Sequence, residues 1–396
     1  MKKNRSSKKS PHVSTSRAAT GFFEEYPDKV VNLEGYRINA DSETKRKRVL
    51  KAAAAVVAVV MVFCVSFTVT RSLKDIVNAP VEEETGEEAR DSGAYAPAAE
   101  LRACFIGMEE ICASPVSAAK KAVELGANAV MTDLKTPDGR LYYRSNASAA
   151  ASSNAWGDAP RNAADAARLL RESGVSPVAR ISCLRDSLGS AYISGGAILA
   201  FGGGVYTDAE GFGWLDPYSY KVRSYIAVLV REIAAMGFEK IILSDFRLPA
   251  AEGIASGNTD SFSDLNEVLR SFLTELRTAA GSSELILELE LKDVAGGENT
   301  VYGTGNMFST ACSAVAVDLR LSRQSKNFTL GGKVFEDPAS VPFSFLADAT
   351  EVLSRVRLET GEKLIVMTGD DDGLNERLFS LMGDSFSGVI VIPESR

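Results

Sequence analysis

From about residue 101 onward, short apolar runs alternate with longer stretches in which apolar residues recur every three or four positions. The short runs are typical of buried strands and the longer stretches of amphipathic helices, so the pattern predicts repeated βα units. It predicts eight strands, at residues 102–107, 128–133, 177–184, 239–245, 284–291, 314–319, 363–368 and 388–392. It also predicts helices at 115–125, 161–173, 218–236, 262–280, 341–357 and 373–382.

Residues at the predicted helix ends support these boundaries. Ser114 precedes Pro115, which suits an N-cap followed by proline in the first turn. Gly126, Gly174 and Gly237 follow the last turn of three helices, where a left-handed cap is common. Eight strands in about 295 residues suit a (β/α)8 TIM-like barrel better than an open doubly wound sheet. Since no Walker loop occurs and no Gly-x-Gly-x-x-Gly follows the first strand, a bound nucleotide is not expected.

A different pattern precedes the barrel. Residues 52–70 carry no charge, consist mostly of Ala, Val, Met and Phe, and follow the basic cluster Lys45–Arg48. Such a run nearly spans a hydrocarbon core of ~30 Å, and its basic flank places the N-terminus in the cytoplasm. Roughly 45 polar residues before it argue against a cleaved signal peptide. The predicted order is a disordered basic cytoplasmic tail (1–48), one transmembrane helix (49–71), an acidic Ala/Pro-rich linker (72–100) and an extracytoplasmic barrel (101–396), which makes a single-pass protein of the cell membrane.

Charge and composition exclude several functions. The net charge is −8 and acidic residues dominate after residue 74, so the barrel offers no basic face to a nucleic acid. The sole histidine, His12, lies in the predicted tail, which removes His-dependent catalytic triads and His-ligated zinc from the barrel. The cysteines show no metal-ligand spacing and could either form disulfides or remain buried thiols. We therefore expect no metal and no cofactor, and chemistry that rests on carboxylates, Lys, Arg, Tyr or hydroxyl groups.

Acidic residues fall where predicted strands end, and the C-terminal strand ends of such barrels carry the active site. Asp245 ends the fourth strand, and period-two alternation places it on the same side as Arg247. In the fifth strand, Leu285–Leu291, leucines alternate with Glu288 and Glu290, so outward leucines would turn both glutamates into the barrel. Such residues also cap helices or pair with arginines, but inward carboxylates are costly unless paired or used. Other strands are followed by Asp186, Asp318 and Asp370–Asp372.

Three stretches carry a family resemblance: NAVMTDLKTPDG (128–139), VSPVARISCLRD (175–186) and GWLDPYSYKVRSYIAVLVREIAAMGFEKIILSDFRLP (213–249). Their marks are Asp133 with Lys135, Arg180 with Asp186, Trp214 with Pro217, and Asp245 with Arg247 and Pro249. Together they resemble a bacterial family of membrane-anchored glycoside hydrolase-like barrels, distantly related to α-amylase-type barrels. The resemblance covers roughly residues 101–250. The second half differs, because Asp318–Ser322 replaces a Pro-Met-x-Tyr-Pro-Ser-His-Tyr run and the family's late tryptophans are missing.

The resemblance implies glycoside hydrolysis by two carboxylates, with Asp245 as nucleophile and Glu290 as general acid. Arg247 or Arg180 would then keep Asp245 ionised through an adjacent positive charge. The alternates to the catalytic pair are Glu288 and Asp133, the latter more suited to orienting a sugar hydroxyl. The candidate sugar contacts are Trp156, Trp214, Tyr206 and Tyr192, although loop aromatics more often serve packing.

The sequence thus favours a membrane-anchored glycoside hydrolase that acts on an extracellular or envelope polysaccharide. The alternative is a catalytically inactive barrel that binds a glycan or supports an envelope complex, and a signalling receptor comes third. An open cleft that contains both Asp245 and Glu290 favours the enzyme, whereas a cleft filled by side chains favours the binding module.

Overall fold

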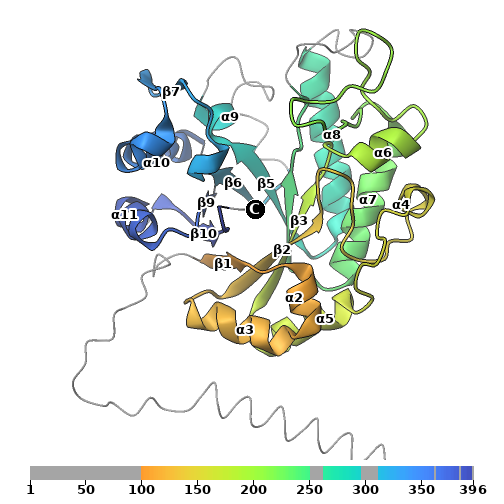
Figure 1. The fold of residues 1–396 in the computed structure, drawn as a ribbon, viewed down its shortest axis with the longest axis horizontal. Helices are drawn as coiled ribbons and strands as arrows, with labels where there is room; N and C mark the ends of the chain where they lie inside the picture. The colour runs from red at the N-terminus through yellow and green to blue at the C-terminus, as the bar shows by residue number, and fades with distance from the viewer. Residues whose placement is uncertain (1–99, 250–261, 296–310, 361–362, 383–384, 395–396) are drawn as a thin grey trace, which may run out of the picture. The chain divides into compact units, whose positions relative to one another are not determined.

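The computed structural model describes residues 100–249, 262–295, 311–360, 363–382 and 385–394 (Figure 1). Within these ranges, none of the helices has both the length and the apolar character needed to cross a membrane. The predicted tail, span and almost all of the linker lie outside the described residues, so these three segments remain predictions.

Eight parallel strands close into a barrel in the order β1-β10-β9-β6-β5-β4-β3-β2 (Figure 1). Their bounds are β1 Leu101–Phe105, β2 Ala129–Lys135, β3 Ser176–Ser182, β4 Lys240–Ser244, β5 Glu284–Glu290, β6 Ala314–Asp318, β9 Leu364–Thr368 and β10 Gly388–Val391. Each coincides with one predicted strand, and β1 pairs with both β2 and β10, which closes the sheet. The prediction of an eight-stranded α/β barrel is confirmed.

The helices lie around this barrel (Figure 1). Their bounds are α2 Met108–Ala113, α3 Pro115–Glu124, α4 Ser148–Ser153, α5 Ala163–Glu172, α6 Ser187–Tyr192, α7 Tyr220–Ala235, α8 Phe262–Ala280, α9 Leu291–Ala295, α10 Pro342–Thr360 and α11 Asp372–Met382. The six predicted helices correspond to α3, α5, α7, α8, α10 and α11. The predicted glycine caps are confirmed, since Gly126, Gly174 and Gly237 have φ angles of 77°, 80° and 92°. The hydroxyl of Ser114 donates to Ser117 Oγ at 2.7 Å, so the predicted Ser114 cap takes a different form.

Alternate residues of each strand face two separate apolar regions, as the period of a strand requires. On β5, Leu285, Leu287 and Leu289 belong to the large core between barrel and helices, whereas Ile286 belongs to the smaller core inside the barrel. The inner core also contains Ala103, Met131, Val178, Ile242, Ala316, Met367 and Ile390. Side chains of the same parity as Ile286, further along β5, therefore point into the barrel, as predicted for its two glutamates.

Two further segments lie between the regular βα units. Strands β7 Phe328–Leu330 and β8 Lys333–Phe335 form an antiparallel pair after β6. Between α6 and α7, isolated bridges fold residues 197–215 back on themselves, and we call this segment the 197–215 arm. The bridges of the arm are Ala197 with Leu215, Leu199 with Val205, and Thr207 with Gly213.

Candidate active site

An open pocket of about 620 Å³ lies at the C-terminal ends of β4, β5 and β6. Its wall includes both predicted catalytic carboxylates, and its other predicted members are Arg247, Glu288, Trp214 and Tyr206. The barrel mouth on this side is therefore a cavity that side chains leave open. A cavity of this size is ordinary for the binding site of a small molecule or of a few sugar units.

Asp245 reaches the pocket through a turn directly after β4. Its φ of 50° lies in the left-handed region, which Asp tolerates better than most residues. Asp245 and Arg247 both line the pocket, while Phe246 between them packs against Phe272 with ring centroids 5.2 Å apart. The hydroxyl of Ser182 lies 2.7 Å from Asp245 Oδ2 and also 2.7 Å from the carbonyl of Arg185. Because both are acceptors, the single hydroxyl proton serves one of them at a time.

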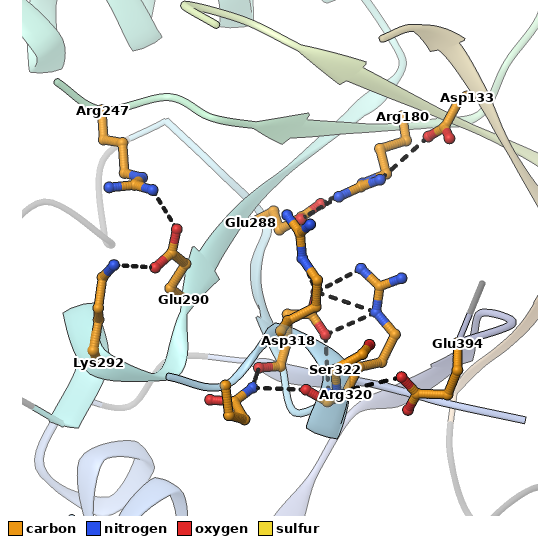
Figure 2. A network of polar contacts seen from close by, with 12 residues as sticks. Asp133, Arg180, Arg247, Glu288, Glu290, Lys292, Asp318, Arg320, Ser322 and Glu394 are labelled. Atoms are coloured by element: carbon orange, nitrogen blue, oxygen red, sulfur yellow. Dashed lines mark hydrogen bonds and ion pairs between the residues drawn. The ribbon is translucent and has the colours of Figure 1, made fainter. Parts of the chain in front are cut away.

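Two groups of polar side chains lie one after the other along β5. We call the group of Glu288 the lower polar layer, because Glu288 precedes Glu290 on the strand; it joins Glu288, Arg180 and Asp133 (Figure 2). Arg180 donates from Nε and Nη2 to the two carboxylate oxygens of Glu288, both at 2.6 Å, and Nη1 lies 3.4 Å from Asp133 Oδ1. Burial raises the pKa of Glu288 above its ordinary value, and Arg180 offsets this only in part. These three residues make a deep ion-pair group, of which Glu288 also lines the pocket.

The upper polar layer joins Glu290, Arg247 and Lys292 (Figure 2). Arg247 pairs with Glu290 Oε1, and Lys292 Nζ lies 2.5 Å from Glu290 Oε2. Burial alone would raise the pKa of Glu290, but Arg247 and Lys292 outweigh it and hold that pKa below its usual range. A general acid must carry a proton at working pH, so this pairing opposes the role that the resemblance implies for Glu290.

Arg185 is a third arginine of the pocket wall, one that the sequence did not predict as part of the site. The two expected candidates send ion pairs to the glutamates of β5, as described above. Burial tends to lower the pKa of Arg185, but Asp208, Asp245 and Glu210 outweigh that effect and raise it. Arg180 and Arg247 pair with Glu288 and Glu290, and the expected support of Asp245 by one of these arginines stays a prediction. Sequence alone could not find Arg185, because it follows β3 and meets the pocket only through the fold.

The predicted sugar contacts divide into two groups. Tyr206, on the 197–215 arm, is half-buried in the pocket wall. Trp214 also lines the pocket but is only 2% exposed, because its Nε1 donates to Asp208 at 2.9 Å and Arg247 lies 5.6 Å above its ring. Trp156 packs against the outer core and Tyr192 is an exposed residue at the end of α6, so neither is among the residues that line this pocket.

Other motif residues hold the walls of the site together. Lys135 and Asp186 form a fully buried pair at 3.0 Å, so the segments after β2 and β3 are joined beneath the surface. Asp186, which follows the third predicted strand, also caps α6 by accepting from the amide of Gly189 at 2.5 Å. Asp318 pairs with Arg320, with Nη2 and Oδ2 2.6 Å apart (Figure 2). Within the described ranges, no cluster of His, Cys, Asp and Glu is suited to a metal ion, and no disulfide links the four cysteines there.

The barrel domain is similar to glycoside hydrolases in its sequence. Residues 108–295 match a family profile described as "Putative glycosyl hydrolase domain", and this agrees with the resemblance seen in residues 101–250. The matched region includes Asp133, Arg180, Asp245 and Glu290 and ends within α9. No curated protein sequence matches this chain.

Solved structures with similar barrels include a hypothetical protein from Ruminiclostridium thermocellum, at 21% identity over 46% of this chain and 96% of that chain, with a TM-score of 0.42. The glycoside hydrolase domain of PelA from Pseudomonas aeruginosa is 15% identical over 74% of this chain and 95% of that chain, with a TM-score of 0.41. The α-galactosidase TtGalA from Thermus thermophilus is 15% identical over 75% of this chain and 62% of that chain, with a TM-score of 0.46. These similarities concern the barrel fold.

Proposed function

We propose that this protein is a membrane-anchored glycoside hydrolase that cleaves an extracellular or envelope polysaccharide with the carboxylates of the barrel mouth. The observation that carries the proposal is that Asp245 and Glu290 both line one open pocket, at the C-terminal ends of neighbouring strands. The match of residues 108–295 to a glycosyl hydrolase domain supports the same reaction class. The anchor is the predicted span at residues 49–71.

The arrangement suits two-carboxylate chemistry at the anomeric carbon of a sugar. Asp245 acts as the nucleophile, and its Ser182 hydrogen bond orients one carboxylate oxygen and leaves the other available. Glu290, held ionised by its two cations, stabilises the positive charge that develops on the sugar ring in the transition state. Arg247 and Lys292, the partners of Glu290, are hydrogen-bond donors and are therefore also suited to bind sugar hydroxyl groups.

The second candidate is a glycan-binding module without turnover. It is favoured by the ion pairs of Glu288 and Glu290, because carboxylates with all their partners in place are also typical of a structural network. It differs from the first candidate in a measurable respect, since binding alone releases no new reducing ends.

The test uses the full-length protein in detergent and a panel of isolated bacterial envelope polysaccharides, with reducing ends as the readout. We expect wild type to release reducing ends and Asp245→Asn to lose at least about 100-fold in kcat, since only the charge of the nucleophile is removed. Asp165→Asn, on the exposed face of α5, is the matched control and should retain wild-type turnover. Binding of a polysaccharide by wild type without any release of reducing ends would establish the binding module instead.

A further inference from the structure

Asp293 is an acidic residue of the pocket that belongs neither to the sequence motifs nor to the two polar layers. It lies in the first turn of α9, three residues after Glu290, and its side chain forms part of the same pocket wall. It is only 8% exposed, so it is among the more deeply buried carboxyl groups of the site.

The hydrogen bonding of Asp293 differs from that of its neighbours. Its Oδ2 has no hydrogen-bond partner among the described residues, although it is buried. The other acidic residues of the wall have partners on nearby side chains: Asp208 and Glu210 on Arg185, Asp245 on Ser182, Glu288 on Arg180, Glu290 on Arg247 and Lys292, and Asp318 on Arg320. A buried carboxylate oxygen without a partner is costly, whereas a protonated carboxyl that awaits an acceptor is much less so.

Burial and the nearby charges together also favour the protonated form of Asp293. Burial raises the pKa of Asp293, and the negative charge of Glu290 adds to this. Arg247, Lys292 and the backbone amide of Glu290 oppose the shift, but the pKa remains above its ordinary value. The two cations contact Glu290 directly, so they favour ionisation of Glu290 more than that of Asp293.

We propose that Asp293 is the proton donor of this site, the group that protonates the glycosidic oxygen, while Asp245 and Glu290 act as ionised carboxylates. This inference rests on the proposed hydrolase function. It changes the assignment implied by the family resemblance, in which Glu290 supplies the proton.

The proposed step balances as follows for Asp245 as nucleophile. The O–H bond of Asp293 breaks as its proton passes to the glycosidic oxygen, and the bond between that oxygen and the anomeric carbon breaks with its electron pair on the oxygen. An oxygen of Asp245 forms the new bond to the anomeric carbon. A water then supplies its hydroxyl to that carbon and its proton to Asp293, and Asp245 leaves as a carboxylate.

The experiment compares Asp293→Asn with wild type on two substrates: the polysaccharide that wild type degrades and the 2,4-dinitrophenyl glycoside of the sugar it releases. On the polysaccharide, kcat should fall by about 100- to 10,000-fold, because a sugar leaves poorly without a proton. On the dinitrophenyl glycoside, kcat should fall by less than about 10-fold, because dinitrophenolate leaves without protonation. Glu290→Gln should lower both rates to a similar extent.

A purely structural role of Asp293 would lower both rates equally, and that result would overturn the inference. Selective loss on the polysaccharide in Glu290→Gln would also overturn it, because the acid would then be Glu290. In either case the proposed hydrolase function would survive. If wild type turned over none of the polysaccharides, that result would overturn both the proposed hydrolase function and the role of Asp293. As an independent readout, the ¹³C carboxyl resonance of Asp293 in wild type should titrate above the ordinary range of an aspartate, and titration below that range would contradict the assignment.

Discussion

Glu288 and Glu290 lie two residues apart on β5, point into the same barrel and pair with arginines, yet their pKa values shift in opposite directions. Glu288 lies deep, with a side chain 10% exposed, and shares one arginine with Asp133. Glu290 lies nearer the C-terminal end of β5, is 41% exposed and pairs with two cations. Depth and the number of cations per carboxylate therefore decide the direction of the shift, and not the identity of the residue.

The comparison separates two kinds of polar layer within one barrel. In the lower layer, the bidentate ion pair gives each buried charge a partner of opposite sign. Its main effect is therefore on the stability of the fold. In the upper layer, the carboxylate of Glu290 remains accessible and charged, so its main effect is on what binds in the pocket. A structure is needed to make this distinction, because both layers look alike as alternating residues of a strand.

The largest expected effect comes from removing the cation of the lower layer. Arg180→Met leaves Glu288 buried without its bidentate partner, and we expect the free energy of unfolding to fall by about 3–5 kcal/mol. Urea unfolding followed by circular dichroism measures this. Replacing both members, Arg180→Met with Glu288→Leu, should recover a large part of the loss, because no buried charge then lacks a partner.

The matched control is Arg168→Met, which removes an exposed arginine that pairs within α5. Its unfolding midpoint should stay close to that of wild type. If Arg180→Met were as mild as this control, the lower layer would not be a stabilising unit and the comparison between the layers would fail.

A smaller effect, of opposite sign in the two layers, is expected in the pH dependence of stability. The pKa of Glu290 is lowered on folding, so its stabilisation is present above its unfolded pKa of about 4.3 and disappears as pH falls through the folded value. The pKa of Glu288 is raised, so its contribution is present below about 4.3 and disappears as pH rises through the folded value.

Urea midpoints measured from about pH 3 to pH 7 for wild type, Glu290→Gln and Glu288→Gln test this. The stability of wild type relative to Glu290→Gln should increase with pH, whereas that relative to Glu288→Gln should decrease. Parallel pH profiles for the two variants would show that both glutamates have the same environment.

The smallest expected effect concerns the hydroxyl that Asp245 shares with a backbone carbonyl. Ser182→Ala removes one donor from two acceptors, and we expect a loss of about 1 kcal/mol in the free energy of unfolding. Ser152→Ala, on the short helix α4, removes a hydroxyl that contacts only the carbonyl of Ser148 in its own helix and serves as the control. A loss no larger than that of the control would mean that Ser182 does not support Asp245.

All eight strands could be predicted from the sequence, because each is a short apolar run bounded by turns. The alternation of leucine and glutamate on β5 also predicted that the glutamates point into the barrel. Ion-pair partners could not be predicted in the same way. Arg180 and Glu288 are 108 residues apart and meet across β4, so their contact depends on strand register around a closed barrel. The 197–215 arm has no periodic pattern, which is why its contribution to the pocket wall was visible only in the aromatic residues.

Parallel strands place the start of β1 at the end of the barrel opposite the pocket. Glu100, just before β1, lies 3.2 Å from Lys363, which precedes β9, so the chain enters the barrel at the end opposite the pocket, here called the base. For the predicted anchor, force along the tether is transmitted to the base and leaves the mouth undisturbed. A tether of the length predicted for residues 72–100 can span at most roughly 100 Å. For the predicted anchor, this length is the largest distance from the membrane at which the base of the barrel could lie.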